Sequence, residues 1–343
     1  MDEMNAEVVA DLRDITHEQW LDLRSTGIGG SDVAAIYGDS PYMSAYTLWL
    51  QKSGRVPRDT ETNEAMEWGH LLEGVVAMKF AVAYECAVVQ WPKMLRSKSH
   101  PFMLANLDFL IVEPSEQFPA GTITQWTEDV PPPNVFSILE IKTTGIVGRG
   151  SGHLWEDGGI PRGYELQGLH YTSVLGITPS VVFAALVAGR GLVSIGRYYS
   201  DEERAECIQR ETEFWNSVMT GVEPELDGSN STSESISKMF PESRTGVFVE
   251  ADDIVAARVK EYVRAKQKAE EADKEMKAIR AKLELFIGEA EELRYEGKTL
   301  LTFKSTKDSE VLDTKALKEQ APEVFQKFSK VRKGYRVLRV KGE

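Results

Sequence analysis

A carboxylate and an amine lie two residues apart near the end of an apolar stretch. Residues Val135–Ile141 are mostly apolar, which is typical of a strand buried on both faces, and Glu140 and Lys142 come at its end. Because successive side chains of a strand point to opposite faces, Glu140 and Lys142 share one face. A divalent cation would satisfy the buried charge of Glu140, and a substrate phosphate would satisfy Lys142. The alternative is a structural ion pair at a strand end.

Two further carboxylates occur in apolar surroundings earlier in the chain. Glu73 lies three residues after His70 on one side of a helix predicted from about residue 63 to 84. Asp108 lies in the middle of the strand-like stretch Phe102–Val112, where a lone carboxylate needs a partner. Three carboxylates and one lysine suit a hard cation such as Mg²⁺ or Mn²⁺ rather than zinc. A metal that joins carboxylates to a phosphate activates water and stabilises charge on phosphorus, so the set indicates phosphodiester hydrolysis.

A second candidate site is the glycine-rich stretch Arg24–Asp32. Its three glycines allow close approach of the backbone to a ligand, and Ser31 is a typical N-cap for a helix over Asp32–Tyr37. The N–H groups at a helix N-terminus bind anions, and Arg24 adds a positive charge nearby. The stretch therefore predicts a phosphate site, and the alternative is an ordinary loop with a capping serine.

Regular elements must position these side chains. The patterns predict a helix over 161–175, which places Gln167 and Tyr171 on one face, a hairpin over 180–199, and an amphipathic helix over 201–220. Together with the strands around Asp108 and Glu140, they predict one domain over residues 16–225. Its fold class is α/β (α+β), with a central mixed sheet flanked by helices.

The last third of the chain has a different pattern. Residues 226–250 are polar and rich in turn formers, which predicts a linker, and 251–343 predict a long helix with a small α+β appendage. Within 252–287 one seam repeats every seven residues, formed by Tyr262, Ala269, Met276 and Leu283 and, three places later, by Ala265, Ala272, Ile279 and Phe286. A helix laid on its own domain and a coiled coil with a partner both fit this seam. Strands are expected over 293–304 and 335–341, around a helical piece.

Composition sets limits on the class of protein. The chain has 343 residues, 42% of them hydrophobic, and a formal net charge of -14, so contact with nucleic acid must be confined to a local groove. Two cysteines, Cys86 and Cys207, cannot form a disulfide framework or a four-cysteine iron–sulfur cluster within one chain. Residues 1–15 are acidic and are predicted to be disordered, not a signal peptide. No apolar run is long enough to span a membrane, so we expect a soluble cytoplasmic protein.

At this point the motifs resemble a known family. Asp108 and Glu140-Ile141-Lys142 resemble the PD-(D/E)XK nuclease signature. Ile28–Gly38, followed by Tyr46–Gly54, resembles more specifically the YqaJ-type viral recombinases, relatives of phage lambda exonuclease. The resemblance covers about residues 16 to 221 and implies a restriction-endonuclease-like core. It also implies a Mg²⁺-dependent (or Mn²⁺-dependent) 5′→3′ exonuclease that digests linear double-stranded DNA and leaves 3′ tails for a phage single-strand annealing protein.

The resemblance also implies roles for individual residues, matched by position. The implied metal ligands are the carboxylates of Glu73, Asp108 and Glu140 and the carbonyl of Ile141. The implied catalytic set adds Lys142 as the catalytic lysine, with Gln167 and Tyr171 on the helix that supports the site. Arg24 and Ser31 would hold a 5′-phosphate, in agreement with the anion site inferred above. A ring-shaped homotrimer around DNA is expected, in the cytoplasm of a bacterial host and encoded by a phage or prophage.

Alternatives to the recombination exonuclease stay open at the level of sequence. An endonuclease or a nuclease that degrades host DNA would use the same site. A non-catalytic scaffold that binds DNA ends would use the long helix instead, although the intact carboxylate–lysine set argues against it. The polarity of digestion, its processivity, the number of metal ions, the annealing partner and the roles of residues 113–134 and 226–343 are not fixed by the sequence.

Overall fold

The computed structural model describes residues 4–57, 63–144, 155, 158–178, 180–187, 191–331 and 334–341. The chain consists of two compact units, Met1–Met239 and Phe240–Glu343. The first unit holds every residue for which the sequence predicts a role in chemistry.

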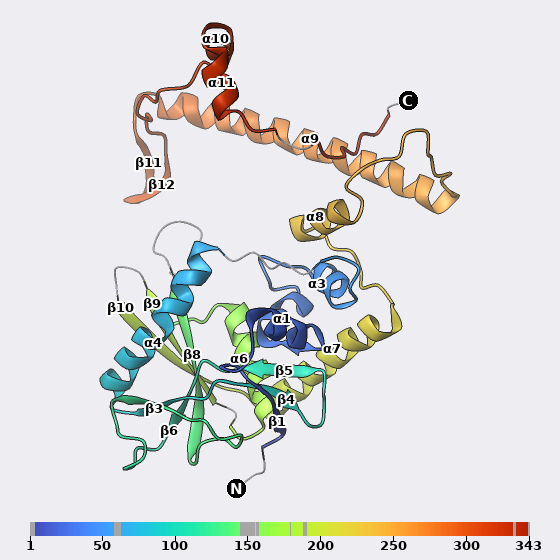
Figure 1. The fold of residues 1–343 in the computed structure, drawn as a ribbon. Coiled ribbons are helices and arrows are strands. Elements are labelled where there is room, and N and C mark those ends of the chain that lie inside the picture. Colours follow the sequence, from blue (N-terminus) through green and yellow to red (C-terminus); the bar gives the residue numbers. More distant parts are fainter. Residues whose placement is uncertain are drawn as a thin grey trace. The chain divides into compact units, whose positions relative to one another are not determined.

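A mixed sheet of six strands, in the order β10-β9-β8-β6-β3-β7, forms the centre of the first unit (Figure 1). Its strands are β3 (Ala87–Gln90), β6 (Phe109–Val112), β7 (Thr122–Gln125), β8 (Val135–Thr144), β9 (Ser180–Val187) and β10 (Gly191–Tyr198). Strand β8 pairs antiparallel with β6 and parallel with β9, so both of its edges are covered. Strand β7, from the long 113–134 connection, pairs with β3 at the edge of the sheet.

Helices cover both faces of this sheet, and β8 contributes alternate residues to each. Leu139 and Ile141 pack in a cluster with side chains of α4 (Glu64–Tyr84). Ile138 packs in the larger cluster with side chains of α6 (Arg162–Leu175) and α7 (Asp201–Thr220). Because strand side chains alternate, the even-numbered Glu140 and Lys142 face α6 together. The predicted fold class, a mixed sheet flanked by helices, is confirmed.

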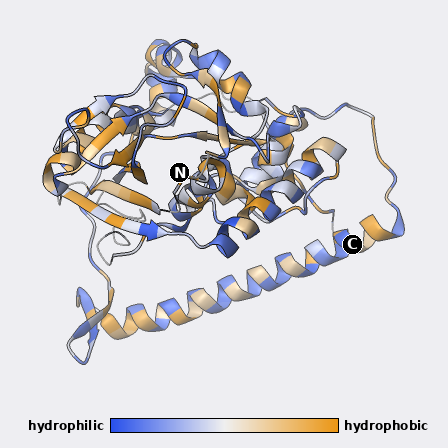
Figure 2. Ribbon diagram, turned by 90° about the horizontal axis from the view of Figure 1, so that it is seen from below, coloured by the Kyte–Doolittle hydropathy of each residue, from blue (hydrophilic) through white to orange (hydrophobic). Residues whose placement is uncertain are grey.

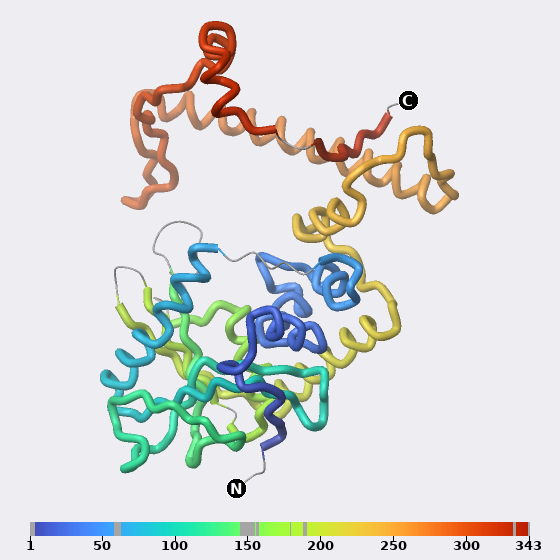
Figure 3. The backbone as a smooth tube through the Cα atoms, in the orientation of Figure 1, coloured from blue at the N-terminus to red at the C-terminus, as the bar shows by residue number. Residues whose placement is uncertain are grey.

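A smaller sheet in the order β1-β4-β5-β2 holds the N-terminus. Its strands are β1 (Ala6–Asp11), β2 (Ile28–Gly29), β4 (Lys93–Ser97) and β5 (Met103–Asn106). The prediction that residues 1–15 are disordered is wrong for the described part. Strand β1 pairs antiparallel with β4, seen in Figure 3 as the dark-blue segment beside the turquoise one. The buried Lys93 Nζ donates to Asp11 Oδ2 at 2.9 Å, a partner too distant in sequence for the local composition to reveal.

The strand predicted over 102–112 is two strands in two sheets. Strand β5 belongs to the smaller sheet and β6 to the larger one, so the chain changes sheets at Leu107 and Asp108. A continuous apolar run cannot distinguish one long buried strand from two short ones. Asp108 therefore lies directly before β6 and is not one of the paired residues of that strand.

Three short helices precede the larger sheet: α1 (His17–Ser25), α2 (Gly30–Ile36) and α3 (Ala45–Lys52). The predicted capping box joins Thr16 and Gln19 at the start of α1. The prediction that Ser31 caps α2 is wrong. The N-cap is Gly29, whose N–H donates to Asp32 Oδ2 at 2.9 Å. The aspartate at the third helical position reaches back one turn to the N-cap amide, which is the contact that the third residue of a capping box makes.

Residues 226–250, predicted to be a linker, contain helix α8 (Asn230–Met239), which belongs to the first unit. Its Thr232 Oγ1 lies 2.7 Å from Ser44 Oγ, and Ser235 Oγ lies 3.0 Å from Thr47 Oγ1 of α3. These four side chains are buried. A run of serine and threonine has the composition of a linker, but here Ser231, Thr232 and Ser235 make hydroxyl–hydroxyl contacts with Ser44 and Thr47.

The second unit contains the predicted long helix, α9 (Asp253–Ile287), along which polar and apolar residues alternate (Figure 2). A hairpin of β11 (Glu292–Tyr295) and β12 (Lys298–Thr302) follows, then α10 (Thr314–Gln320) and α11 (Pro322–Phe328). The described residues of 335–341 form no strand, contrary to prediction. Among all described residues, no helix has both the length and the apolar content required to cross a membrane.

Candidate active site

Three side chains from β8 and α6 form a closed hydrogen-bonded group. Lys142 Nζ lies 2.6 Å from Glu140 Oε1, which confirms that the two side chains share a face of the strand. Gln167 donates through Nε2 to the same Glu140 oxygen at 2.7 Å and accepts from Lys142 Nζ at 3.2 Å. Gln167 Nε2 also lies 2.9 Å from the hydroxyl of Tyr171, one turn along α6. The predicted supporting face of α6 is therefore in contact with the carboxylate–lysine pair.

Helix α6 is fixed in place by a buried polar pair behind Tyr171. His170 Nδ1 lies 2.8 Å from Glu211 Oε1 of α7, and Nε2 lies 2.8 Å from the carbonyl oxygen of Leu104 in β5. Because a carbonyl and a carboxylate only accept, both ring nitrogens carry protons and the imidazole is a cation. Burial alone would lower the pKa of His170, but Glu211 raises it above its ordinary value. The pair ties α6 to α7 and to the smaller sheet.

Asp108 and Glu73 lie at the edge of this group. Asp108 Oδ2 accepts a hydrogen bond from the N–H of Ile141 at 2.8 Å, which holds the carboxylate beside β8. Glu73 Oε1 lies 2.9 Å from His70 Nδ1, within α4. The side chain of Glu73 is half-buried and that of His70 is exposed. The structure thus gives Glu73 a partner within its own helix, while Asp108 is oriented by the backbone between Glu140 and Lys142.

Negative charge accumulates in this site. Burial, together with the charge of Asp108, raises the pKa of Glu140 to about 8. Burial and the charge of Asp108 also raise the pKa of Glu73. Burial opposes the charge on Lys142, but Glu140 and Asp108 hold its pKa above the ordinary value. Lys142 is therefore a cation in this arrangement, suited to donate to a phosphate oxygen rather than to accept a proton.

The donor set fits a divalent cation, although the ligands are not yet gathered around one point. Glu140 Oε2 is buried and has no hydrogen-bond partner in the described part of the chain. Carboxylates that raise one another's pKa are those that a hard cation would stabilise. Over the residues that the structure describes, however, no group of three or more His, Cys, Asp or Glu side chains is arranged to hold a metal. Glu73 is hydrogen-bonded to His70 of its own helix instead.

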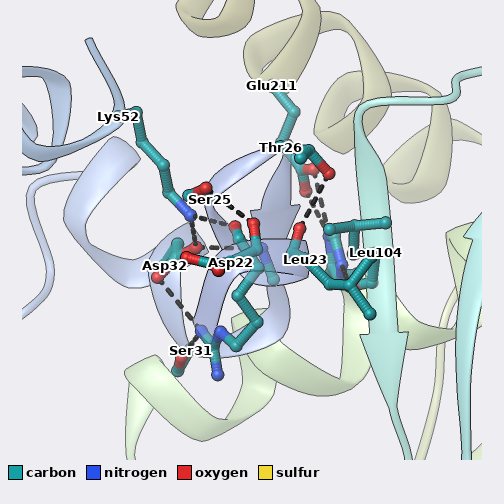
Figure 4. Close-up of polar contacts among 12 residues, drawn as sticks. Asp22, Leu23, Ser25, Thr26, Ser31, Asp32, Lys52, Leu104 and Glu211 are labelled. Carbon is teal, nitrogen blue, oxygen red and sulfur yellow. Dashed lines mark hydrogen bonds and ion pairs between the residues drawn. The ribbon is translucent and has the colours of Figure 1, made fainter. Parts of the chain in front are cut away.

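A second polar cluster surrounds Arg24 (Figure 4). Arg24 Nη2 donates to Ser31 Oγ at 2.8 Å and lies 3.4 Å from Asp32 Oδ1. The guanidinium of Arg24 lies over the ring of Trp20. Lys52 Nζ lies 2.9 Å from Asp32 Oδ2. Burial opposes the charge on Asp32, but Lys52 and Arg24 together lower its pKa to about 2. One carboxylate thus faces two cations, and the cluster keeps a net positive charge.

The two clusters meet at Gly30. A side chain there would place its Cβ 2.6 Å from Tyr171 Cε1 and 3.0 Å from Gln167 Cγ. The predicted close backbone approach is therefore made to α6, and the adjacent Ser31 turns outward to Arg24. In the structure, the positive charge of the predicted anion site does not come from the helix N-terminus. Helix α2 has seven residues and its capping amide is already bonded, so the positive charge comes from side chains.

Sequence reasoning missed Asp32 and Lys52 as members of the Arg24 cluster. Both lie in the quoted motifs, Asp32 four residues after Ile28 and Lys52 two residues before Gly54. An aspartate at the start of the helix predicted over Asp32–Tyr37 and a lysine at the end of α3 are each typical of a solvated helix end. Only their burial, which local patterns do not report, marks them as part of a site.

Comparisons with known proteins agree with the motifs. The family model described as YqaJ-like viral recombinase domain matches residues 19–178. The chain is 30% identical over 332 residues to the uncharacterized protein YqaJ of Bacillus subtilis (strain 168), covering 96% of each protein. Among solved structures it is similar to an alkaline exonuclease, LHK-Exo, from Laribacter hongkongensis, with 14% identity over 60% of this chain and 93% of that one and a TM-score of 0.43.

The complex of LHK-Exo with dAMP matches with a TM-score of 0.44. The identity to the Bacillus subtilis protein extends along nearly the whole length of both chains. The chain belongs to the YqaJ-like viral recombinase family.

Proposed function

We propose that this protein is a divalent-metal-dependent 5′→3′ exonuclease that digests linear double-stranded DNA. In this proposal it acts in the cytoplasm of a bacterial host and leaves 3′ single strands for a phage annealing protein. The observation that carries the proposal is the contact of Glu140, Lys142 and Gln167, beside Asp108 and within the electrostatic reach of Glu73. A ring-shaped homotrimer, as the family resemblance implies, would let the enzyme stay on one DNA end.

Asp108 and Glu140 are the proposed principal ligands of Mg²⁺ or Mn²⁺, with the Ile141 carbonyl and Glu73 completing the set. A bound divalent cation would supply positive charge to the phosphate and make water a better nucleophile. Glu140 would offer Oε2, which has no hydrogen-bond partner among the described residues. Glu73 would release His70 to take part. The hydrogen bond from the Ile141 N–H keeps Asp108 in place throughout.

Lys142 and Gln167 are the proposed groups that orient the reacting phosphate. The reaction adds water to phosphorus and breaks the bond to the 3′ oxygen, so the released nucleotide keeps its own 5′-phosphate and the remaining strand begins with a new one. Lys142, held as a cation, donates to a phosphate oxygen on which negative charge grows. Gln167 fixes the position of the ammonium, and Tyr171 fixes that of Gln167.

Arg24 and Ser31 are the proposed pocket for the terminal 5′-phosphate. What supports this is the net positive charge of the cluster, since Asp32 faces both Arg24 and Lys52. A pocket of this kind would pull each newly formed end into register for the next cleavage. It would also separate an exonuclease from an endonuclease on the same site, because an endonuclease does not need to hold an end.

Duplex DNA labelled at its ends, offered as a linear 5′-phosphorylated, a linear 5′-hydroxyl or a circular nicked substrate, tests the proposal. In the presence of Mg²⁺ we expect mononucleotides from the 5′ ends of linear DNA, fastest with the 5′-phosphate, and none in EDTA. Digestion from 3′ ends would overturn the polarity. Cleavage of circular DNA at the same rate would favour the endonuclease, and binding of ends without digestion would favour the scaffold.

A further inference from the structure

Helix α9 carries an apolar seam that the described residues of its own unit leave exposed. The seam consists of the first and fourth positions of four successive heptads, Tyr262, Ala265, Ala269, Ala272, Met276, Ile279, Leu283 and Phe286. Met276 is 60% exposed, Ile279 50% and Phe286 77%, and Ile287 is the one buried residue of this fully described helix. Helices gain most of their stability by packing an apolar face, so a seam of this length requires a partner.

The spacing of the seam indicates what kind of partner it fits. Its members recur every 3.5 residues on average over Tyr262–Phe286, without a charged residue at any of the eight positions. A helix laid on a sheet or a globular domain follows the 3.6-residue period and drifts away from a strict heptad. A strict heptad stays in line only against another helix that supercoils with it.

The charges that flank the seam are complementary to the same helix. In a parallel coiled coil, the residue just before a first position faces a residue on the other helix that lies five places further along the sequence. That residue directly follows a fourth position. When two copies of α9 lie in register, three of these facing pairs consist of two charged residues. The charges are opposite in each pair: Glu261 with Lys266, Lys268 with Asp273, and Glu275 with Arg280. Within one helix Asp273 pairs with Lys277, and Arg280 pairs with Glu284. These ion pairs are exposed, so replacing them by ion pairs between two helices costs little free energy.

We propose that α9 pairs with the α9 of a second copy of this chain, parallel and in register. A partner of different sequence would not require the seam to be complementary to itself. Two antiparallel copies with their seams fully overlapped would instead bring like charges together beside the seam, Lys268 with Lys282 and Lys266 with Arg280. The alanines at 265, 269 and 272 allow close approach of the helices, and the larger side chains fill the C-terminal half. This pairing concerns the second unit alone and depends neither on the proposed nuclease activity nor on the proposed homotrimer.

A cysteine at Ala265 tests the pairing and its direction in the full-length protein. In the parallel arrangement the two copies of residue 265 face each other, so Ala265→Cys should form an interchain disulfide under mild oxidation. The matched control is Ala278→Cys, which is exposed on the same helix outside the seam and should stay uncrosslinked. The unsubstituted protein, with Cys86 and the buried Cys207, provides the blank.

Charge exchange tests the flanking pairs in the Ala265→Cys background. Glu275→Lys alone and Arg280→Glu alone each place like charges together twice, and each should lower the association constant roughly tenfold. Mixing the two variants should restore crosslinking, because the introduced lysine of one chain then meets the introduced glutamate of the other, and the native Glu275 meets the native Arg280. Glu271→Lys makes the same charge change outside the seam and should crosslink like its parent. Restoration on mixing also shows that the single variants are folded.

Two outcomes would overturn the inference. If Ala265→Cys crosslinks no better than Ala278→Cys, α9 is monomeric or antiparallel. If Glu275→Lys and Arg280→Glu crosslink normally alone and no better when mixed, any association of the chain does not use this seam.

Discussion

Two polar clusters on either side of Gly30 differ in how their carboxylates are balanced. Around Glu140, burial and the charge of Asp108 exceed the effect of Lys142, and the pKa of Glu140 rises to about 8. Around Asp32, Lys52 and Arg24 exceed the effect of burial, and the pKa falls to about 2. Among the residues named here, acidic groups outnumber cations in the first cluster, and cations outnumber acidic groups in the second. This difference supports the proposal that the first cluster receives a cation and the second receives an anion.

The largest effect should follow from removing the one cation of the first cluster. Lys142→Ala should lower Mg²⁺-dependent digestion by about 10³-fold, the range expected when a group that assists catalysis is lost. Binding of duplex DNA should change little, because the Arg24 cluster is untouched. Initial rates on 5′-labelled DNA and a binding titration in EDTA measure the two separately. Lys79→Ala, an exposed lysine on α4, is the control, and normal digestion by Lys142→Ala would sink the proposed mechanism.

The second effect concerns the stability of the metal-free protein. A carboxyl whose pKa is raised on folding stabilises the protein below its unfolded pKa, near 4.5, and that stability is lost as pH rises through about 8. Between pH 5 and pH 8 the loss should be on the order of 3 kcal/mol. Glu140→Gln should flatten this slope, and Mg²⁺ should raise the melting temperature of the parent protein at pH 8 but not that of the variant. His170 titrates in the same direction, so the difference between parent and variant is the quantity to compare.

An identical slope in parent and Glu140→Gln would mean that Glu140 is ionised throughout, and the comparison between the clusters would fail. Stabilisation of the variant by Mg²⁺ as strong as that of the parent would place the cation elsewhere.

The third effect has the opposite sign with pH. Asp32 is a carboxyl whose pKa is lowered on folding, so its contribution is present above about pH 3.8 and is lost as pH falls toward 2. Asp32→Asn should lower the free energy of unfolding at pH 7 by about 2 kcal/mol, less than for a fully buried pair because Arg24 is partly exposed. Denaturant unfolding measures it, with the exposed Asp14→Asn as control. An unchanged midpoint would show that Lys52 and Arg24 do not need this counter-charge.

The sequence predicts these clusters unequally, for a physical reason. Glu140 and Lys142 share a strand, and Gln167 and Tyr171 share a helix, so fixed periods of two and near four place each pair. Asp32 and Lys52 come from different helices, and their meeting depends on tertiary packing that no local period encodes. The same limit explains β1 and α8, whose partners Lys93 and Ser44 are distant in sequence. The residue type of Asp108 predicts a site residue, but the sequence does not predict that the chain changes sheets at this position.

The smallest effect should come from a substitution in the Arg24 cluster. Arg24→Ala should remove most of the preference for 5′-phosphorylated over 5′-hydroxyl ends, roughly tenfold or about 1.4 kcal/mol, because an exposed edge of the guanidinium remains available to a phosphate. Rates on the two substrates, measured at matched enzyme concentration, give the ratio directly. Arg55→Ala is a close control, since Arg55 also stacks over a tryptophan, Trp49, but pairs with Glu223 outside the cluster. If Arg24→Ala keeps the preference for 5′-phosphorylated ends while Arg55→Ala loses it, the positive charge that holds the DNA end lies outside the Arg24 cluster. The excess of positive charge around Asp32 would then serve only the stability of the fold.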